Sequence, residues 1–569
     1  MQLVHGLHFD NLRGDLYGGL TAAVVALPLA LAMGVSAGAG PIAGIYGAIF
    51  VGLFAALFGG TPAQVSGPTG PMTVVMAAVF TQYTAMFPDD PARGAALAFT
   101  IVVLGGLFQI LFGVLKLGKY INLIPHPVVS GFMSGIGVII ILLQFGPLLG
   151  HPALPGPLAS ARALPEILSH PVPAAVALGL LSLTVVYLLP ARINRLIPSP
   201  LLALVLGSVA LWLWQGGEIS STVENGKTLY RMGGATVLGD IPGGVPVPRM
   251  PVFELALLPG MLKSALMLAA LGSIDSLLTS LVADNITRTY HDSDRELIGQ
   301  GIGNSIAGLF GGLPGAGATM RTVVNVRAGG RTPLSGALHA LVLLAVVLGA
   351  GSVARYIPHA VLAGILVKVG TDIIDWDYLK RLHRAPKAGV VMMFTVLFIT
   401  VFVDLITAVA IGMIMASFVF MQRMVELQLD SIVAITSPAP ESPLSETESR
   451  LLEAAGGRIL LFHVSGPMSF GAAKGMARRL AGFDQYDVLI LDLSEVPQID
   501  FTSCRAIDDM LHDAWDSGRE AYLVSCTPRV QAMLEQQGVL DDRHRDRLLA
   551  SRREALERGL ERVRQRSGD

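Results

Sequence analysis

Fourteen runs of mostly apolar residues, separated by short connections, dominate this sequence. Seven runs lie between residues 16 and 214, and seven more lie between residues 259 and 424. A helix needs about 20 apolar residues to cross a bilayer, and most of the runs approach that length. Backbone amides cannot stay unpaired in lipid, so such runs fold as helices. The 569-residue chain, 52% hydrophobic and 14% charged, is therefore predicted to be a polytopic α-helical membrane protein.

The two sets of seven runs form a repeat, about residues 12–216 and about residues 257–426. Seven spans are an odd number, so the second set enters the membrane from the opposite side, which gives an inverted repeat. In each set the third run is short and follows a Gly/Pro-rich segment, at residues 67–71 and 311–317. Matched broken segments indicate a transporter's binding site. The alternative is that they are loops or packing glycines, which membrane helices often contain.

Asp275 is a carboxylate inside an apolar run, where charge is costly and usually functional. Thr279 follows four residues later and so shares its helix face. With the backbone carbonyls of Gly317, Ala318 and Thr319, these side chains would offer the all-oxygen environment that hard cations prefer, and we expect a sodium site. Two alternatives stand: a buried Asp satisfied by Arg321 or a helix amide end, and a proton-binding Asp.

The two broken segments also predict an anion site. Half-helices would begin near Thr69 and Gly70 and near Ala318 and Thr319, with Gly317 leaving the backbone open to close approach. Free amides at two opposed helix starts would cradle a small oxyanion. Gln64 and Ser66 are candidates for contact with the anion. Arg321 is a candidate either to add positive charge there or to hold a carboxylate such as Asp275.

Lys and Arg residues are concentrated in alternate connections, which predicts that both termini lie in the cytosol. Residues 1–429 would form the transmembrane domain and residues 430–456 a Pro/Ser/acid-rich linker. Residues 457–569 alternate strand-like and helical stretches, as in a small α/β domain with a charged tail. Neither Cys504 nor Cys526 is expected in a disulfide. We find no catalytic or transition-metal motif, and expect no enzyme and no cofactor beyond sodium.

These motifs resemble those of the sulfate permease (SulP) family of anion transporters, and within it the BicA-type sodium-dependent bicarbonate transporters. The resemblance rests on residues 13–23, 67–72, 273–287 and 311–322, and residues 457–569 resemble the family's STAS domain. It implies a core of spans 1–4 and 8–11, a gate of spans 5–7 and 12–14, and an elevator-like movement of core against gate. It also implies a homodimer in the inner membrane, with the anion between half-helices 3 and 10.

Within the STAS-like region, Thr502 falls at the phosphoacceptor position of soluble anti-sigma-factor antagonists. Phe501 and Ser503 depart from their Asp-Ser-Ser-Gly pattern, which puts phosphorylation in doubt. The leading function is sodium-coupled bicarbonate symport. The first alternative is a proton-coupled or exchanging transporter of sulfate or a dicarboxylate. The second is a membrane signalling protein that works through its STAS-like domain.

Overall fold

The computed structural model describes residues 4–567 apart from residues 124, 155, 195–196, 217, 225–226, 240–245, 404, 440–441, 481, 484, 525 and 541–544. The chain divides into two compact units, Met1–Ala416 and Ser417–Asp569. Each unit has its own core. Their boundary differs from the predicted limits at residues 429/430 and 456/457, which stay predictions.

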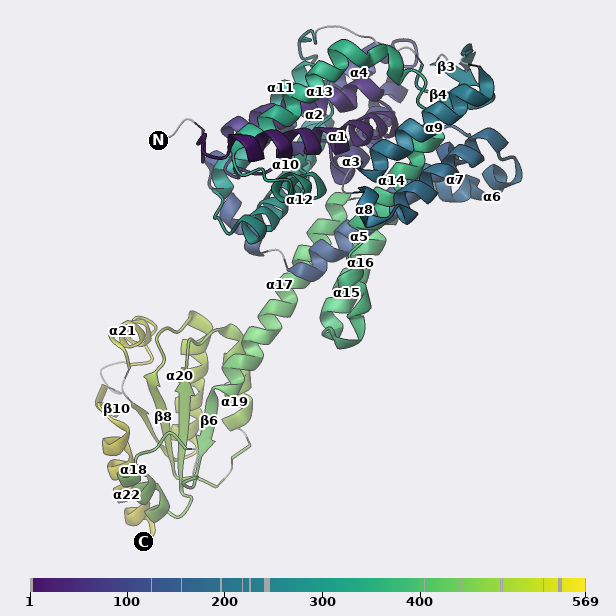
Figure 1. Ribbon diagram of the computed structural model, residues 1–569. Coiled ribbons are helices and arrows are strands. Elements are labelled where there is room, and N and C mark those ends of the chain that lie inside the picture. Colours follow the sequence, from purple (N-terminus) through teal and green to yellow (C-terminus); the bar gives the residue numbers. More distant parts are fainter. Residues whose placement is uncertain are drawn as a thin grey trace. The chain divides into compact units, whose positions relative to one another are not determined.

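A helix lies over each of the fourteen predicted runs (Figure 1). These helices are α1 (Leu12–Ser36), α2 (Pro41–Phe58), α3 (Gly70–Met86), α4 (Pro91–Val114), α5 (His126–Leu148), α7 (Pro173–Leu188), α9 (Ser199–Gln215), α10 (Leu258–Thr287), α11 (Ser293–Leu309), α12 (Thr319–Arg327), α13 (Pro333–Ala354), α14 (His359–Ile373), α16 (Lys387–Phe402) and α17 (Leu405–Asp430). The polytopic α-helical fold class is thereby confirmed.

By length and composition alone, 6 of the described helices could cross a membrane, and a bent pair, α6 (Pro157–Ser169) with α7, would raise the number to 7. Several of the others are apolar but shorter, including α9 and α16. The half-helix α12 is too short to cross a bilayer alone, since it has only 9 residues. The number of fourteen crossings stays a prediction.

The connections hold elements that the sequence did not predict. Short helices occur at α8 (Ala191–Asn194), α15 (Trp376–Lys380), η1 (Gly118–Leu123) and η2 (Leu382–Arg384). The polar segment between the repeats forms an antiparallel sheet of β2 (Ser220–Glu224), β3 (Lys227–Met232) and β4 (Ala235–Val237). The charged residues of this segment interrupt the alternation of apolar and polar residues that predicts strands.

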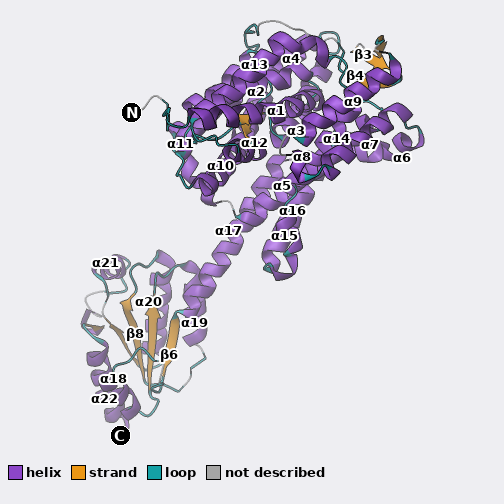
Figure 2. Ribbon diagram, in the orientation of Figure 1, coloured by secondary structure: helices purple, strands orange, loops and turns teal. Residues whose placement is uncertain are grey.

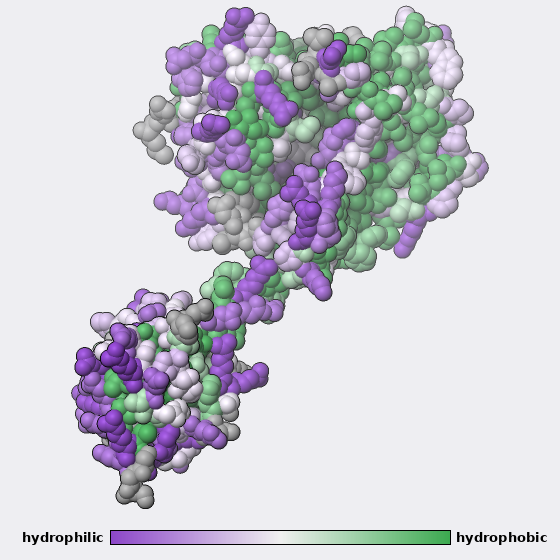
Figure 3. Space-filling model, turned by 60° about the horizontal axis from the view of Figure 1, so that its bottom comes forward, coloured by the Kyte–Doolittle hydropathy of each residue, from purple (hydrophilic) through white to green (hydrophobic). Residues whose placement is uncertain are grey.

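The helices of the first unit pack in two groups. Helices α1–α4 pack with α10–α13, while α5, α7 and α9 pack with α14 and α16. The groups meet where α1 contacts α9 and α14, and where α3 contacts α5. This arrangement matches the core and gate implied by the family resemblance. The face seen in Figure 3 carries a broad apolar surface, and exposed Leu188, Leu213 and Phe398 suit contact with lipid tails.

The second unit is an α/β domain around a five-stranded sheet in the order β10-β9-β8-β7-β6. The strands are β6 (Ile432–Ile435), β7 (Ile459–Ser465), β8 (Val488–Glu495), β9 (Glu520–Val524) and β10 (Leu548–Leu549). β6 pairs antiparallel with β7, and the other pairings are parallel. The three strands predicted from the sequence correspond to β7, β8 and β9.

Helices cover both faces of this sheet (Figure 2). One apolar core joins it to α19 (Phe470–Leu480), α20 (Phe501–Asp516) and α21 (Pro528–Gln536). The other joins it to α18 (Glu446–Ala454) and α22 (Arg552–Ser567), and η3 (Arg545–Arg547) precedes β10. The domain therefore has the sandwiched sheet that alternating strands and helices predict.

Candidate anion and cation site

Two short strands pair inside the helical unit and set the geometry of the site. We call the place where they meet the crossing. β1 (Ser66–Gly67) pairs antiparallel with β5 (Ala316–Gly317), with Ser66 opposite Gly317. Each strand leads within two residues to a helix cap, Thr69 before α3 and Ala318 before α12. Both half-helices therefore begin at the crossing, and their free amide ends lie close to the same place. The predicted pair of broken helices is present.

At the crossing the two backbone segments lie too close together for a residue larger than glycine at position 315. A Cβ atom on Gly315 would lie 2.4 Å from the carbonyl carbon of Gly67, which is backbone and cannot turn away. Pro71 occupies the first turn of α3, where a missing amide hydrogen costs nothing. The Gly/Pro-rich segments therefore have a steric reason to break both helices here.

The side chain of Thr279 joins α10 to this crossing. Its hydroxyl, fully buried, lies 2.9 Å from the carbonyl oxygen of Gly317 and 2.8 Å from the hydroxyl of Thr319. The Gly317 amide in turn donates to the hydroxyl of Ser276, at 3.1 Å. Three oxygens from α10, β5 and the start of α12 thus lie together, and their role as cation ligands stays a prediction.

Asp275 lies on the same helix with its side chain in the interior. The residue is 7% exposed, and its Oδ2 makes no hydrogen bond within the described structure. The Thr69 hydroxyl acts on this carboxylate as a hydrogen-bond donor, although the contact falls outside strict hydrogen-bond geometry, and the charge of Arg321 acts on it as well. A buried oxygen with no donor is costly, so this carboxylate suits a bound cation or proton.

Arg321 reaches across the crossing to the other half of the repeat. It is 3% exposed, and its Nη2 donates to the carbonyl oxygen of Pro68 at 2.7 Å. Within the described residues no ion pair joins it to Asp275. The charge of Arg321 nevertheless acts on the Asp275 carboxylate, so the alternative in which Arg321 balances Asp275 stays a prediction. Arg321 also places a positive charge beside the start of α3.

Gln64 and Ser66 are held by a polar network beneath the crossing. Gln64 Nε2 donates to Glu296 Oε1 at 2.7 Å, and Gln300 Nε2 donates to the hydroxyl of Ser66 at 2.6 Å. Glu296 also accepts from the backbone amides of Gly60 and Thr61, each at 2.9 Å. These contacts place Gln64 and Ser66 where they support the crossing strands.

Sequence reasoning missed Gln300 and Asn304, which hold the site together, and expected Glu296 only to cap or pair within the core. Asn304 donates to the Gly315 carbonyl at 2.9 Å and accepts from the Gly315 amide at 2.7 Å. Glu296, Gln300 and Asn304 recur at intervals of four and so share one face of α11. That polar stripe on an otherwise apolar helix was a signal that could have found them.

Comparison with known proteins places the chain in a family. The sulfate permease family model matches residues 12–428, and the STAS domain model matches residues 454–554. This chain belongs to the sulfate permease family.

Curated relatives of this family member cover nearly its whole length. It is 46% identical to the bicarbonate transporter BicA of a Synechocystis species over 537 residues, 94% of this chain and 92% of that protein. It is also 46% identical to BicA of a Picosynechococcus species over 562 residues, 98% and 97% of the two chains. A putative sulfate transporter of Bacillus subtilis, YvdB, is 29% identical over 79% of each chain.

Solved structures agree with the fold of this sulfate permease family member. The transmembrane domain of a cyanobacterial BicA covers 73% of this chain and all of that chain, with 48% identity and a TM-score of 0.64. The overall structure of SLC26A9 covers 99% of this chain and 92% of that chain, with a TM-score of 0.79 and 18% identity. This second likeness concerns the fold alone.

Thr502 of the STAS domain lies exposed in the first turn of α20. Asp500, which lies two residues before Thr502, caps this helix by accepting a hydrogen bond from the Ser503 amide at 2.8 Å. Thr502 is thus accessible, while Ser503 is buried. A phosphoacceptor role for Thr502 stays a prediction.

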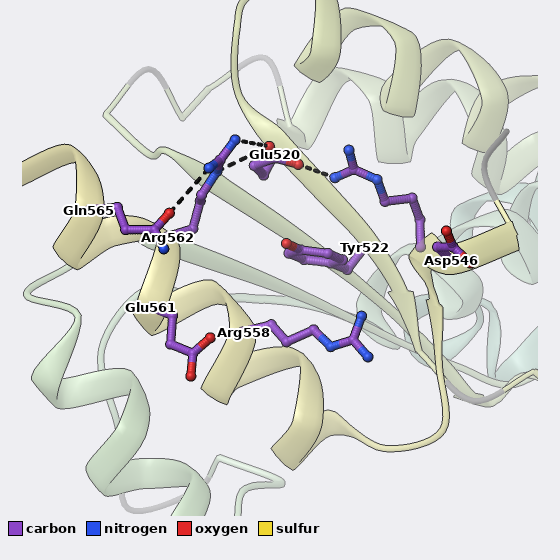
Figure 4. A pocket seen from close by; sticks show the side chains of 8 residues that line it. Glu520, Tyr522, Asp546, Arg558, Glu561, Arg562 and Gln565 are labelled. Carbon is purple, nitrogen blue, oxygen red and sulfur yellow. Dashed lines mark hydrogen bonds and ion pairs between the residues drawn. The ribbon is translucent and has the colours of Figure 1, made fainter.

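The STAS domain also has an open pocket of about 310 Å³ lined by β9, η3 and α22 (Figure 4). Its three arginines are already paired: Arg547 and Arg562 both bind Glu520, the latter at 2.9 Å, and Arg558 binds Glu554 at 2.9 Å. Burial opposes ionisation of Glu520, but the hydrogen bond from Arg547 and those from Arg562 outweigh it and lower the pKa of this carboxyl. We assign the pocket a structural role, the attachment of α22 to the sheet.

Proposed function

We propose that this protein is a secondary active transporter that carries bicarbonate together with sodium. The observation that carries the proposal is the set of groups at the crossing: Asp275 with an unpartnered buried oxygen, the three oxygens around Thr279, and two helix starts. The two BicA relatives, named bicarbonate transporters, support the choice of substrate.

In this proposal sodium binds to oxygens of Asp275, Thr279 and the segment Gly317–Thr319. Each supplies oxygen rather than nitrogen or sulfur, which suits a hard cation. Sodium would satisfy the buried Oδ2 of Asp275, the atom that the surrounding side chains leave without a donor. One sodium carried with one bicarbonate would make transport electroneutral.

The anion would lie between the starts of α3 and α12, against Thr69, Gly70, Gly317, Ala318 and Thr319. Backbone amides at helix starts carry partial positive charge and bind oxyanions. The guanidinium of Arg321, held at the Pro68 carbonyl, adds positive charge on the same side. The hydroxyl of Thr69, which acts on Asp275 in this structure, would donate to the anion when the anion is bound.

Transport would follow from movement of the core group of helices against the gate group. The site lies in the core, and the start of α3 is close to the gate, because a Cβ atom on Gly70 would lie 2.7 Å from side-chain atoms of both Ile140 and Ile373. We also propose a homodimer in the inner membrane with both termini in the cytosol. The protein would act as a carrier, not as an enzyme.

Uptake into proteoliposomes tests this function. We expect labelled bicarbonate to enter when an inward sodium gradient is applied, and labelled sulfate and fumarate to enter much less. Sodium-independent uptake of sulfate or fumarate driven by a proton gradient would favour the first alternative. A variant lacking residues 457–569 that still binds bicarbonate would argue against the signalling alternative.

A further inference from the structure

Two exposed phenylalanines lie side by side at one end of the STAS domain. Phe470 begins α19 and is 53% exposed, and Phe501 begins α20 and is 57% exposed. The Phe470 amide donates to Oδ2 of Asp500 at 2.7 Å, which ties the two helix starts together. Adjacent exposed aromatic side chains on a folded domain indicate an interaction surface.

Helix α17, which belongs partly to the same compact unit, shows which end of the domain is nearer the membrane. Its apolar side chains Phe418 and Phe420 are exposed, and most of the candidate span Thr407–Asp430 is not buried within the protein. Such a surface suits lipid tails. The apolar run ends at Gln422 and Arg423, so the helix leaves the hydrocarbon at about this point.

Helix α19 packs beside the last turns of α17 and runs in the same direction. Gly471 is so close to Val425, and Gly475 so close to Leu429, that a Cβ atom on either glycine would overlap the leucine or valine side chain. Ser469 also donates to the Gln428 side chain at 2.7 Å. The residue numbers rise together along both helices, so the first residue of α19 is at its membrane-proximal end.

The distance to the lipid boundary is short. Val425 follows Arg423 by two residues, which is about 3 Å along a helix. Phe470 is the neighbour of Gly471, and Phe501 begins α20 at the same end because Asp500 accepts from the Phe470 amide. Both aromatic side chains therefore lie near the level at which α17 leaves the bilayer.

We propose that Phe470 and Phe501 insert into the cytoplasmic headgroup region of the bilayer and dock the STAS domain on the membrane. Aromatic side chains are enriched at this depth, where an apolar ring is removed from water without crossing the hydrocarbon. The bilayer is the partner at this level, because the starts of α19 and α20 lie beside the turn of α17 that follows its exit from the hydrocarbon. This proposal does not depend on the transported substrate.

A fluorescent probe next to Phe501 tests the docking. The probe is attached to Thr502→Cys in the full chain, reconstituted in phosphatidylethanolamine/phosphatidylglycerol vesicles whose acyl chains are brominated near the headgroup. Burial raises the pKa of the Cys504 thiol to about 11 and that of Cys526 to about 12, so at neutral pH the introduced thiol reacts first. The matched control is Ser517→Cys, which is exposed just after the other end of α20.

We expect bromine to quench the probe at position 502 several-fold more than the probe at position 517. Phe470→Ser with Phe501→Ser should reduce the quenching at 502 to the level at 517, while Phe470→Leu with Phe501→Leu should keep it. Because both side chains are exposed, an unchanged melting temperature will show that the Ser pair still folds. Equal quenching at the two positions, or quenching that survives the Ser pair, would overturn the proposal. Efficient bismaleimide linkage of two copies through position 502 without lipid quenching would assign the surface to a second copy instead.

Discussion

The hydroxyl of Thr279 lies 2.9 Å from the carbonyl oxygen of Gly317, which joins the middle of α10 to the strand that leads into the α12 half-helix. The proposed cation ligands and the proposed anion cradle therefore share Gly317, Ala318 and Thr319. An ion held by the oxygens on one side fixes the backbone that binds the ion on the other. This shared backbone gives a physical reason for coupling between the two ions.

Replacing Asp275 with Asn tests the proposed cation site. Asn keeps the size of the side chain but removes the negative charge that would balance sodium. We expect sodium-driven bicarbonate uptake to fall at least about tenfold, which corresponds to about 1.4 kcal/mol. Asp372→Asn is the control, because Asp372 is a partly exposed acid paired with Lys368 outside the site. Uptake that is unaltered in Asp275→Asn would place the sodium site elsewhere.

Thr279 offers a more selective test, since its hydroxyl can be removed without changing the shape of the side chain. Thr279→Val leaves the Gly317 carbonyl and the Thr319 hydroxyl without their partner. We expect the sodium concentration for half-maximal uptake to rise roughly tenfold, equivalent to about 1.4 kcal/mol. Thr279→Ser, which keeps the hydroxyl, should stay close to wild type. Equal defects in both variants would indicate that the methyl group, and so packing, is what matters.

Local patterns predicted part of this site and could not predict the rest. A charge in an apolar run marked Asp275, helical spacing added Thr279, and the Gly/Pro-rich segments marked both half-helices. Ser276 is different. Its hydroxyl donates to the carbonyl of Gly272, four residues back, as serines in membrane helices often do. The same hydroxyl accepts a hydrogen bond from the Gly317 amide. The second contact joins residues 41 positions apart, which no local pattern specifies.

The same limit applied to the fold. The lengths of the apolar runs predicted a helix at every one of them, because burial in lipid forces that answer. The short strands β1 and β5 have no strand composition, and they pair only because two broken segments from different repeats meet. Their pairing is a consequence of the tertiary fold.

Gly315→Ala tests the steric argument for the crossing. The added Cβ would lie 2.4 Å from the Gly67 backbone, so β1 and β5 must move apart. Overpacking of this kind costs about 1–3 kcal/mol, and we expect a lower melting temperature in detergent together with a loss of uptake. Gly349→Ala is the matched control, because a Cβ at that position in α13 meets no atom within 4 Å. Similar stability in the two variants would show that the crossing has room to relax.

Asp492 gives the STAS domain a defined pH dependence. Burial alone would raise the pKa of this carboxyl, but hydrogen bonds from His463, at 2.8 Å, and from Ser494, together with the charge of Arg552, lower it. A carboxyl whose pKa is lowered by folding stabilises the folded state at any pH above its ordinary, unfolded-state pKa of about 3.9. That contribution is lost as the pH falls through the folded-state pKa.

Asp492→Asn should therefore destabilise the domain by about 1–3 kcal/mol at neutral pH, since His463 and Arg552 lose a charged partner. The difference from wild type should shrink as the pH falls below about 4, because the wild-type carboxyl is then protonated as well. Hydrogen exchange of β7 and β8 in the full chain measures this at each pH. Asp513→Asn, an exposed acid on α20, should leave exchange unchanged throughout. A pH-independent difference for Asp492→Asn would mean that shape, not charge, holds His463 and Arg552 in place.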